Sequence, residues 1–194
     1  MPDDHRAKIR AATHDDIDAI VAIARSVQLS SSIDTSRGFL ISAFPRDIYS
    51  AAIDAAAAPS GGEHVVVLVA EATTEVTGFL YGYNRAYALA KTIGQAERDI
   101  ASRVSGPFYV LKQIAAEAKR RQGGVGRQLL ERFLQETGSC DVYAAIVADP
   151  PNPASNEFHR RMGFEPTFAS ISRNAIGGVF PNILWRRHGS LEHH

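Results

Sequence analysis

Residues Arg120 to Leu134 read RRQGGVGRQLLERFL and place three glycines directly before an amphipathic helical pattern. The start of a helix leaves backbone N–H groups unpaired and carries a partial positive charge. Glycine lets a ligand approach that backbone closely, and Arg120, Arg121 and Arg127 add charge around it. The stretch therefore predicts a phosphate-binding helix start, with a plain tight turn as the alternative.

Two common phosphate loops do not fit this stretch. A Walker loop carries Lys and then Ser or Thr after its last glycine, where Arg127 and Gln128 stand here. A dinucleotide-binding fingerprint has a third glycine where Leu129 stands, and its ribose-binding acid is not evident. Residues Arg121–Gly126 instead fit the pattern R-x-x-G-x-G, after a predicted strand over Gly106–Ala115.

A second motif, NPASNEFHRRMGF, spans Asn152–Phe164. Asparagine followed by proline is a good helix start, and Phe158 and Met162 lie four residues apart on one helix face, as core residues do. Gly163 fits the end of such a helix. Each residue alone is explained by structure, so the functional interpretation depends on the register of this motif with the glycine loop.

Together the two motifs resemble those of the GCN5-related N-acetyltransferase (GNAT) superfamily. That superfamily has R-x-x-G-x-G at its acetyl-CoA loop and N-x-x-A-x-x-F-Y-x-x-x-G-F after its fifth strand. Here Ser155 replaces the alanine and His159 replaces the tyrosine. The second motif is also similar to that of a bacterial group of predicted acetyltransferases without an assigned substrate. The resemblance covers nearly the whole chain apart from residues 84–105 and 191–194.

The pattern of elements predicts an α+β fold, with β-branched runs such as HVVVLVAEA separated by alanine-rich or amphipathic helical stretches. The resemblance implies a mixed, mostly antiparallel sheet of about seven strands flanked by helices. We expect one domain over residues 1–190, with an insertion at 84–105 between the third and fourth strands. This partly helical insertion is expected to form a lid or a homodimer surface. Residues 191–194 read as an expression-tag remnant.

Composition narrows the classes of function. The 194 residues carry 21 Lys+Arg and 21 Asp+Glu, and this zero formal charge argues against nucleic-acid binding. No apolar run is long enough for a membrane helix, and the polar N-terminus does not read as a signal peptide. Cys140 is the only cysteine, so no internal disulfide forms and a cytoplasmic location is expected.

For the cofactor, the resemblance implies acetyl-CoA as cosubstrate and no metal. The pyrophosphate is expected at the glycine loop and the pantetheine arm along an open strand edge. The backbone N–H of Ala116 is the expected oxyanion donor. The residues expected to bind acetyl-CoA are Ile114, Ala115, Ala116, Arg121, Gln122, Gly123, Gly124, Val125, Gly126, Arg127, Asn152, Ser155 and Phe158.

For catalysis, His159 stands where relatives carry the tyrosine that protonates the departing thiolate. It is a candidate acid, with packing against the cofactor or hydrogen bonding to it as the alternative. Glu71, Glu117 or a water chain are candidate bases for the amine. Lys112 lies on the central strand, with an acceptor-side or a structural role.

For the acceptor, the resemblance points to the loop before the second helix, with Arg37 and Phe39. Tyr81, Tyr83 and Phe108 are further candidates, although aromatic residues on strands usually pack in the core. The acceptor is expected to be a small-molecule or peptide amine, and an amino acid, a polyamine, an antibiotic and a peptide N-terminus all remain open. The predicted function is transfer of acetyl from acetyl-CoA to a primary amine. The alternatives are a non-catalytic acyl-CoA sensor and a nucleotide-binding protein of another class.

Overall fold

The fold is an α+β sheet structure, seen in a computed structural model that describes residues 7–30, 33–91, 94–117, 124–174 and 177–189. Its seven strands are ordered β1-β2-β3-β4-β5-β7-β6, and every pair is antiparallel except β4 with β5. This confirms the expected mixed, mostly antiparallel sheet. The strands are β1 (Lys8–Ala11), β2 (Val65–Ala72), β3 (Glu75–Asn84), β4 (Phe108–Ala116), β5 (Asp141–Val147), β6 (Glu165–Arg173) and β7 (Val179–Arg187).

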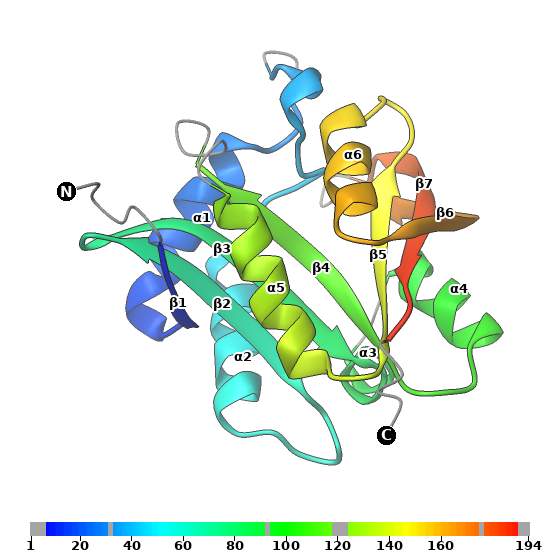
Figure 1. Ribbon diagram of the computed structural model, residues 1–194, viewed down its shortest axis with the longest axis horizontal. Coiled ribbons are helices and arrows are strands. Elements are labelled where there is room, and N and C mark those ends of the chain that lie inside the picture. The colour runs from blue at the N-terminus through cyan, green and yellow to red at the C-terminus, as the bar shows by residue number, and fades with distance from the viewer. Residues whose placement is uncertain (1–6, 31–32, 92–93, 118–123, 175–176, 190–194) are drawn as a thin grey trace.

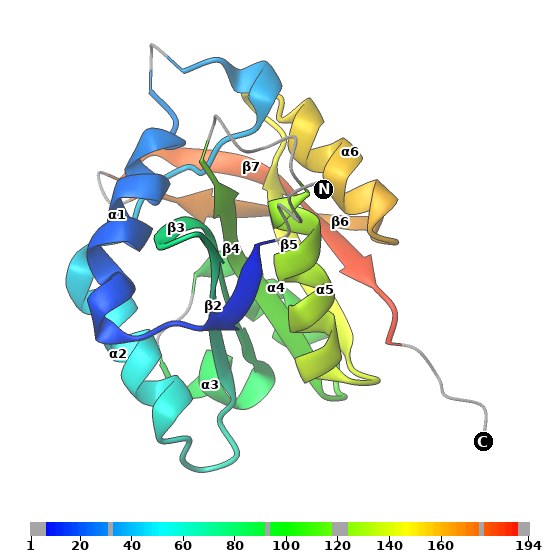
Figure 2. The same ribbon diagram turned by 60° about the vertical axis from the view of Figure 1, so that its left-hand side comes forward.

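Helices cover both faces of the sheet, as Figure 2 shows with α1 and α2 on one side and α5 on the other. The α-helices are α1 (Ile17–Ser26), α2 (Arg46–Ala57), α3 (Arg85–Ala90), α4 (Gln95–Arg103), α5 (Val125–Thr137) and α6 (Pro153–Arg161), and the short 3-10 turns are η1 (His14–Asp16) and η2 (Thr35–Arg37). Strand β2 is buried on both faces. Val65, Val67 and Val69 pack in the cluster with α1 and α2, whereas Val66 and Leu68 pack in the cluster with α5. No helix within the described ranges is long and apolar enough to cross a bilayer.

Two glycines on β3 let α5 lie close to the sheet. A Cβ added to Gly82 would come within 2.5 Å of the Phe133 ring, and one added to Gly78 within 2.7 Å of Val125. These contacts are shorter than real Cβ atoms make, so side chains on β3 would push α5 outward. The two glycines of β3 therefore set how close α5 lies to the sheet.

The sheet opens between β4 and β5, which Figure 1 shows diverging from a common end. Their pairing runs from Phe108 opposite Asp141 to Leu111 opposite Ala144 and stops there. On its other side, β4 bulges at Lys112, because Gly82 of β3 pairs with Leu111 and the preceding Tyr81 pairs with Gln113. The last residues of β4 and of β5 therefore face a gap.

The expected insertion at residues 84–105 contains α3 and α4, and α4 packs into the structure. Ile100 is fully buried, and Asp99 accepts a hydrogen bond from Ser170 of β6 at 2.6 Å. Arg103 lies over the ring of Phe168, also on β6, at 4.5 Å. The helix thus forms a wall beside the gap between β4 and β5.

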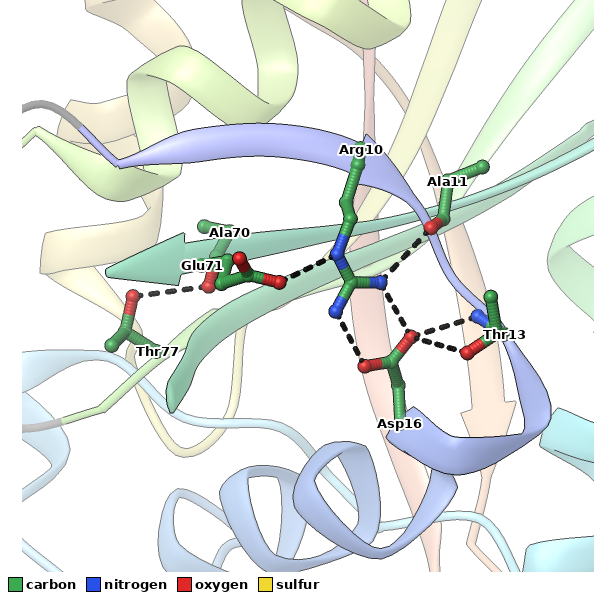
Figure 3. Close-up of polar contacts among 7 residues, drawn as sticks. All are labelled: Arg10, Ala11, Thr13, Asp16, Ala70, Glu71 and Thr77. Carbon is green, nitrogen blue, oxygen red and sulfur yellow. Dashed lines mark hydrogen bonds and ion pairs between the residues drawn. The ribbon is translucent and has the colours of Figure 1, made fainter. Parts of the chain in front are cut away.

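An ion-pair cluster attaches the turn between β1 and α1 to the sheet (Figure 3). Arg10 donates two hydrogen bonds to Asp16, at 2.7 and 2.8 Å, and a third to Glu71 on β2 at 2.7 Å. Asp16 also accepts from the Thr13 backbone N–H at 2.8 Å. Hydrogen bonding to Arg10 holds the pKa of the Asp16 carboxyl below its usual range. This cluster accounts for Glu71, which belongs to an ion pair near one edge of the sheet.

We predict that Asp16→Asn lowers the free energy of unfolding by about 1–3 kcal/mol, because it weakens a buried, charge-assisted hydrogen-bond pair. Urea denaturation measures the change, and Asp15→Asn is the matched control. Asp15 is exposed in the same turn, so its variant is expected to stay within about 0.5 kcal/mol of the wild type. Equal losses in the two variants would contradict the role given to Asp16.

Candidate active site

Two cavities flank the gap between β4 and β5. The loop cavity, of about 290 Å³, lies between the end of β4, the start of α5, and α6. The inner cavity, of about 170 Å³, is lined by β4 and β5 inside the gap, with α4, α6, β6 and β7 around it. Phe39, Leu40, Ile114, Ser155 and His159 line both cavities, so the two spaces adjoin at these residues.

The open edge of β4 presents backbone donors to the gap. The N–H of Glu117 donates to Thr77 on β3 at 2.9 Å. Because N–H groups alternate sides along a strand, those of Ala116 and Ile114 point away from β3, toward the gap. Ala115 faces β3 with its backbone, and its side chain is buried. Geometry therefore makes Ile114 and Ala116 the donors available to a ligand.

The start of α5 lies beside that edge. Gly124 precedes the helix with φ 72° and ψ 11°, a left-handed conformation that favours glycine. The N–H groups of the first turn, at Val125, Gly126 and Arg127, have no carbonyl within the helix to bind. Gly124, Gly126 and Arg127 line the loop cavity, whereas the Val125 side chain is buried in the core. The predicted cofactor residues Arg121, Gln122 and Gly123 lie outside the described residues.

Helix α6 closes the other side of the loop cavity. Asn152 is buried and caps the helix by accepting from the Ser155 N–H at 3.3 Å. Its amide nitrogen donates to the Phe39 carbonyl at 3.2 Å, which attaches the segment after η2 to α6. The ring of Phe158 lies 3.5 Å from the point where a Cβ on Gly126 would be. The two helices thus meet at a glycine, and Asn152 holds the wall of the site together.

His159 is buried, with 4% of its surface exposed. Its Nδ1 lies 2.8 Å from the Ser155 carbonyl oxygen, so Nδ1 carries the proton and donates it. Its ring packs edge-on against Phe158 and Phe164. Nε2 is buried and has no hydrogen-bond partner among the described residues. Burial lowers the pKa of His159 to about 4, so the neutral ring presents a lone pair and no acidic proton.

Sequence analysis missed Glu97, a buried carboxylate in the inner cavity. One of its oxygens accepts hydrogen bonds from Tyr83 at 2.7 Å and from Lys112 at 2.6 Å. In the sequence, Glu97 is only an acidic residue in the first turn of a weak helix, which gives no sign of burial. Lys112, on the central strand, is the ion-pair partner of this carboxylate.

The structure places the predicted acceptor residues in different surroundings. Tyr81 and Tyr83 are buried in the core cluster with α1 and α2, and neither is among the residues lining the two cavities. Phe108 is likewise fully buried. Arg37 lines the loop cavity and not the inner one, whereas Phe39 lines both. Alternation along a strand buried on both faces does not show which side chains reach a cavity.

Residues 33–164 match the model of the family described as "Acetyltransferase (GNAT) family". No curated protein sequence gives a significant match. Among the described residues, no three His, Cys, Asp or Glu side chains are grouped as they would be around a metal ion.

Solved structures resemble the chain over nearly its full length. The ribosomal-protein-alanine N-acetyltransferase from Brucella melitensis is 21% identical, with a TM-score of 0.62 over 93% of this chain and 99% of that one. An N-acetyltransferase from Staphylococcus aureus is 19% identical, with a TM-score of 0.62 over 94% and 98%. A phosphinothricin acetyltransferase from Sinorhizobium meliloti, solved with AcCoA, is 18% identical, with a TM-score of 0.61 over 95% and 89%. These likenesses show a shared fold.

The buried imidazole predicts a pH-dependent stability. Because the pKa of His159 is lower in the folded protein, the unfolded chain takes up a proton first as the pH falls. The contribution of His159 to the free energy of unfolding is therefore complete above about pH 6.5 and is lost as the pH falls toward 4. Between pH 7 and pH 4, we expect the wild type to lose up to about 3 kcal/mol more unfolding free energy than His159→Phe. Denaturation series at several pH values measure this difference.

The control for this prediction is His188→Phe, at an exposed histidine. That variant is expected to follow the wild-type profile. A His159→Phe profile parallel to the wild type would show that burial does not hold the imidazole neutral.

Proposed function

The chain belongs to the GNAT acetyltransferase family, and we propose that it transfers the acetyl group of acetyl-CoA to a primary amine of an acceptor molecule. The observation that carries this proposal is the open edge of β4 next to the Gly124 helix start. Backbone donors for an extended arm and an anion site for phosphates lie side by side there. In this proposal the acceptor would bind in the adjoining inner cavity, on the other side of the gap.

Binding of acetyl-CoA is proposed to use main-chain groups for the most part. The N–H groups of the first turn of α5 would bind the pyrophosphate, with Arg127 adding charge and Arg37 lining the same cavity. The N–H and C=O groups of Ile114 and Ala116 would pair with the amides of the pantetheine arm, as a neighbouring strand would. The structure solved with AcCoA for the Sinorhizobium relative supports this choice of ligand.

The proposed acetyl transfer relies mainly on main-chain groups and on the positions of the two reactants. The amine attacks the thioester carbon, the C–N bond forms and the C–S bond breaks. The proton lost by nitrogen balances the thiolate, which leaves as a thiol. The Ala116 N–H would donate to the carbonyl oxygen as negative charge develops on it. Holding the two reactants on either side of the gap would supply much of the rate.

One observation favours a second candidate function, a non-catalytic acyl-CoA sensor. His159 stands where relatives carry their tyrosine, and its free nitrogen bears no proton near neutral pH. His159 therefore does not donate a proton to the departing thiolate. Release of free thiol from acetyl-CoA over a broad amine panel separates the two candidates, because a sensor binds acetyl-CoA and releases none.

We predict that the protein binds acetyl-CoA with micromolar affinity in calorimetric titration, and that Gly124→Glu weakens binding by about 100-fold or more. The substitution places a side chain and a negative charge at the start of α5, where two or more charge-assisted hydrogen bonds would be lost. Gly138→Glu is the matched control, because Gly138 ends the same helix, also at positive φ, with open space around it.

Gly124 has φ 72° and ψ 11°, in the left-handed region that other residues sometimes adopt, whereas Gly138 has φ 57° and ψ −129°, a conformation nearly restricted to glycine. Thermal unfolding should therefore show at least as large a loss of stability in Gly138→Glu as in Gly124→Glu. Retained affinity in Gly138→Glu together with lost affinity in Gly124→Glu supports the loop assignment. Unchanged affinity in Gly124→Glu would overturn it.

A further inference from the structure

Two buried hydrogen-bond acceptors in the inner cavity have no donors. Glu97 is 1% exposed and its Oε2 has no partner among the described residues; His159 is 4% exposed and its Nε2 has none either. Both residues line this cavity. Buried polar atoms are normally paired, so two orphans in one cavity indicate a place for a ligand that donates hydrogen bonds.

The orientation of Glu97 is fixed by its other oxygen. Oε1 accepts from the Tyr83 hydroxyl and the Lys112 ammonium, which leaves Oε2 directed elsewhere. Burial acts to raise the pKa of Glu97, but Lys112 and the Tyr83 hydroxyl outweigh it and hold the pKa below its usual value. Glu97 also lies in the first turn of α4, near the positive end of that helix. The cavity therefore contains a carboxylate with one unsatisfied oxygen.

The orientation of His159 is fixed in the same manner. Its Nδ1–H is held by the Ser155 carbonyl, so the ring can only accept at Nε2. Because His159 lines both cavities, this acceptor lies where the acetyl group and the acceptor molecule must meet. A primary amine or its ammonium form offers two or three N–H donors, which is what Glu97 and His159 lack.

The same cavity has an excess positive charge. Lys112 and Glu97 neutralise each other at 2.6 Å. Arg173, at the end of β6, also lines the cavity, is exposed, and has no ion-pair partner within the described part of the chain. A guanidinium suits a carboxylate, which it can bind with two parallel hydrogen bonds. A second cation on the ligand would instead be repelled.

From these features, and on the basis of the acetyl transfer proposed above, we propose that the acceptor is a small zwitterionic amine of the amino-acid type. Its amine lies at Glu97 and His159, and its carboxylate lies at Arg173. The inner cavity, of about 170 Å³, is smaller than the roughly 300–1,000 Å³ of drug-sized pockets, which suits a molecule of this size. Polyamines carry the wrong second charge for Arg173.

The test compares amino acids with the amines that lack their carboxylate. Leucine is paired with isoamylamine and phenylalanine with phenethylamine, and putrescine and spermidine are added. Acetylation is followed by thiol release. We expect kcat/KM to favour one or more of the amino acids over its matched amine by about 10-fold or more, the value of one charge-assisted contact.

Arg173→Gln tests the residue itself. It is expected to raise KM for the preferred amino acid by about 10-fold and to leave KM for acetyl-CoA and for the matched amine unchanged. Arg187→Gln is the control, because Arg187 ends the neighbouring strand β7 and does not line the inner cavity. Glu97→Gln should lower kcat/KM for amino acids and for plain amines alike, because both use the amine that Glu97 binds. It should keep the affinity for acetyl-CoA, and thermal unfolding checks that the variant is folded.

The outcomes separate this inference from the proposed function. Failure to bind acetyl-CoA overturns both. Binding of acetyl-CoA with equal or better acetylation of polyamines or plain amines, or an Arg173→Gln effect on all amines alike, overturns the inference alone. If no amine is acetylated, thermal shifts with CoA present decide: a rise with amino acids only supports the zwitterion site, and equal or absent shifts overturn it.

Discussion

The site depends on one incomplete strand pairing. β4 and β5 run parallel and share their ladder only from Phe108 to Leu111. β4 bulges at Lys112, just after this ladder ends, and the rest of the strand pairs with β3 on one side and with no described strand on the other. Backbone N–H groups that a complete sheet would consume stay available there. The two cavities and the adjoining ends of α5 and α6 are arranged around this gap.

The polar groups around the gap divide into satisfied and unsatisfied ones. Gln113 accepts from Tyr49 at 2.7 Å and donates to the Ser42 carbonyl at 2.9 Å, so both ends of its amide are occupied. Asn152 is similarly engaged at both ends. By contrast, Glu97 Oε2 and His159 Nε2 have no partner among the described residues, and neither do Arg85 Nε and Trp185 Nε1. Of these four atoms, only those of Glu97 and His159 belong to residues that line the inner cavity.

Much of the fold could be predicted from the sequence. Strands β2 to β5 are rich in β-branched or aromatic residues, and the glycine loop and the NPAS motif place α5 and α6. The strand gap itself came only from family resemblance, because no local pattern encodes where a parallel pairing stops. Glu97 and Arg173 were missed because their surroundings come from segments distant in the chain. The tautomer of His159 likewise depends on its burial within the folded structure.

Besides the residues that they share, the loop cavity and the inner cavity are lined by polar groups from different parts of the chain. The backbone donors beside the loop cavity are on β4 and at the start of α5, whereas the one carboxylate among the described residues of the inner cavity, Glu97, belongs to α4. Helix α4 lies in a segment of the sequence outside both the glycine loop and the second motif. A substitution at Glu97 therefore alters the inner cavity and leaves the sequence of the β4 edge and of the α5 start unchanged, so the carboxylate of the inner cavity and the backbone donors of the loop cavity are encoded by separate parts of the chain.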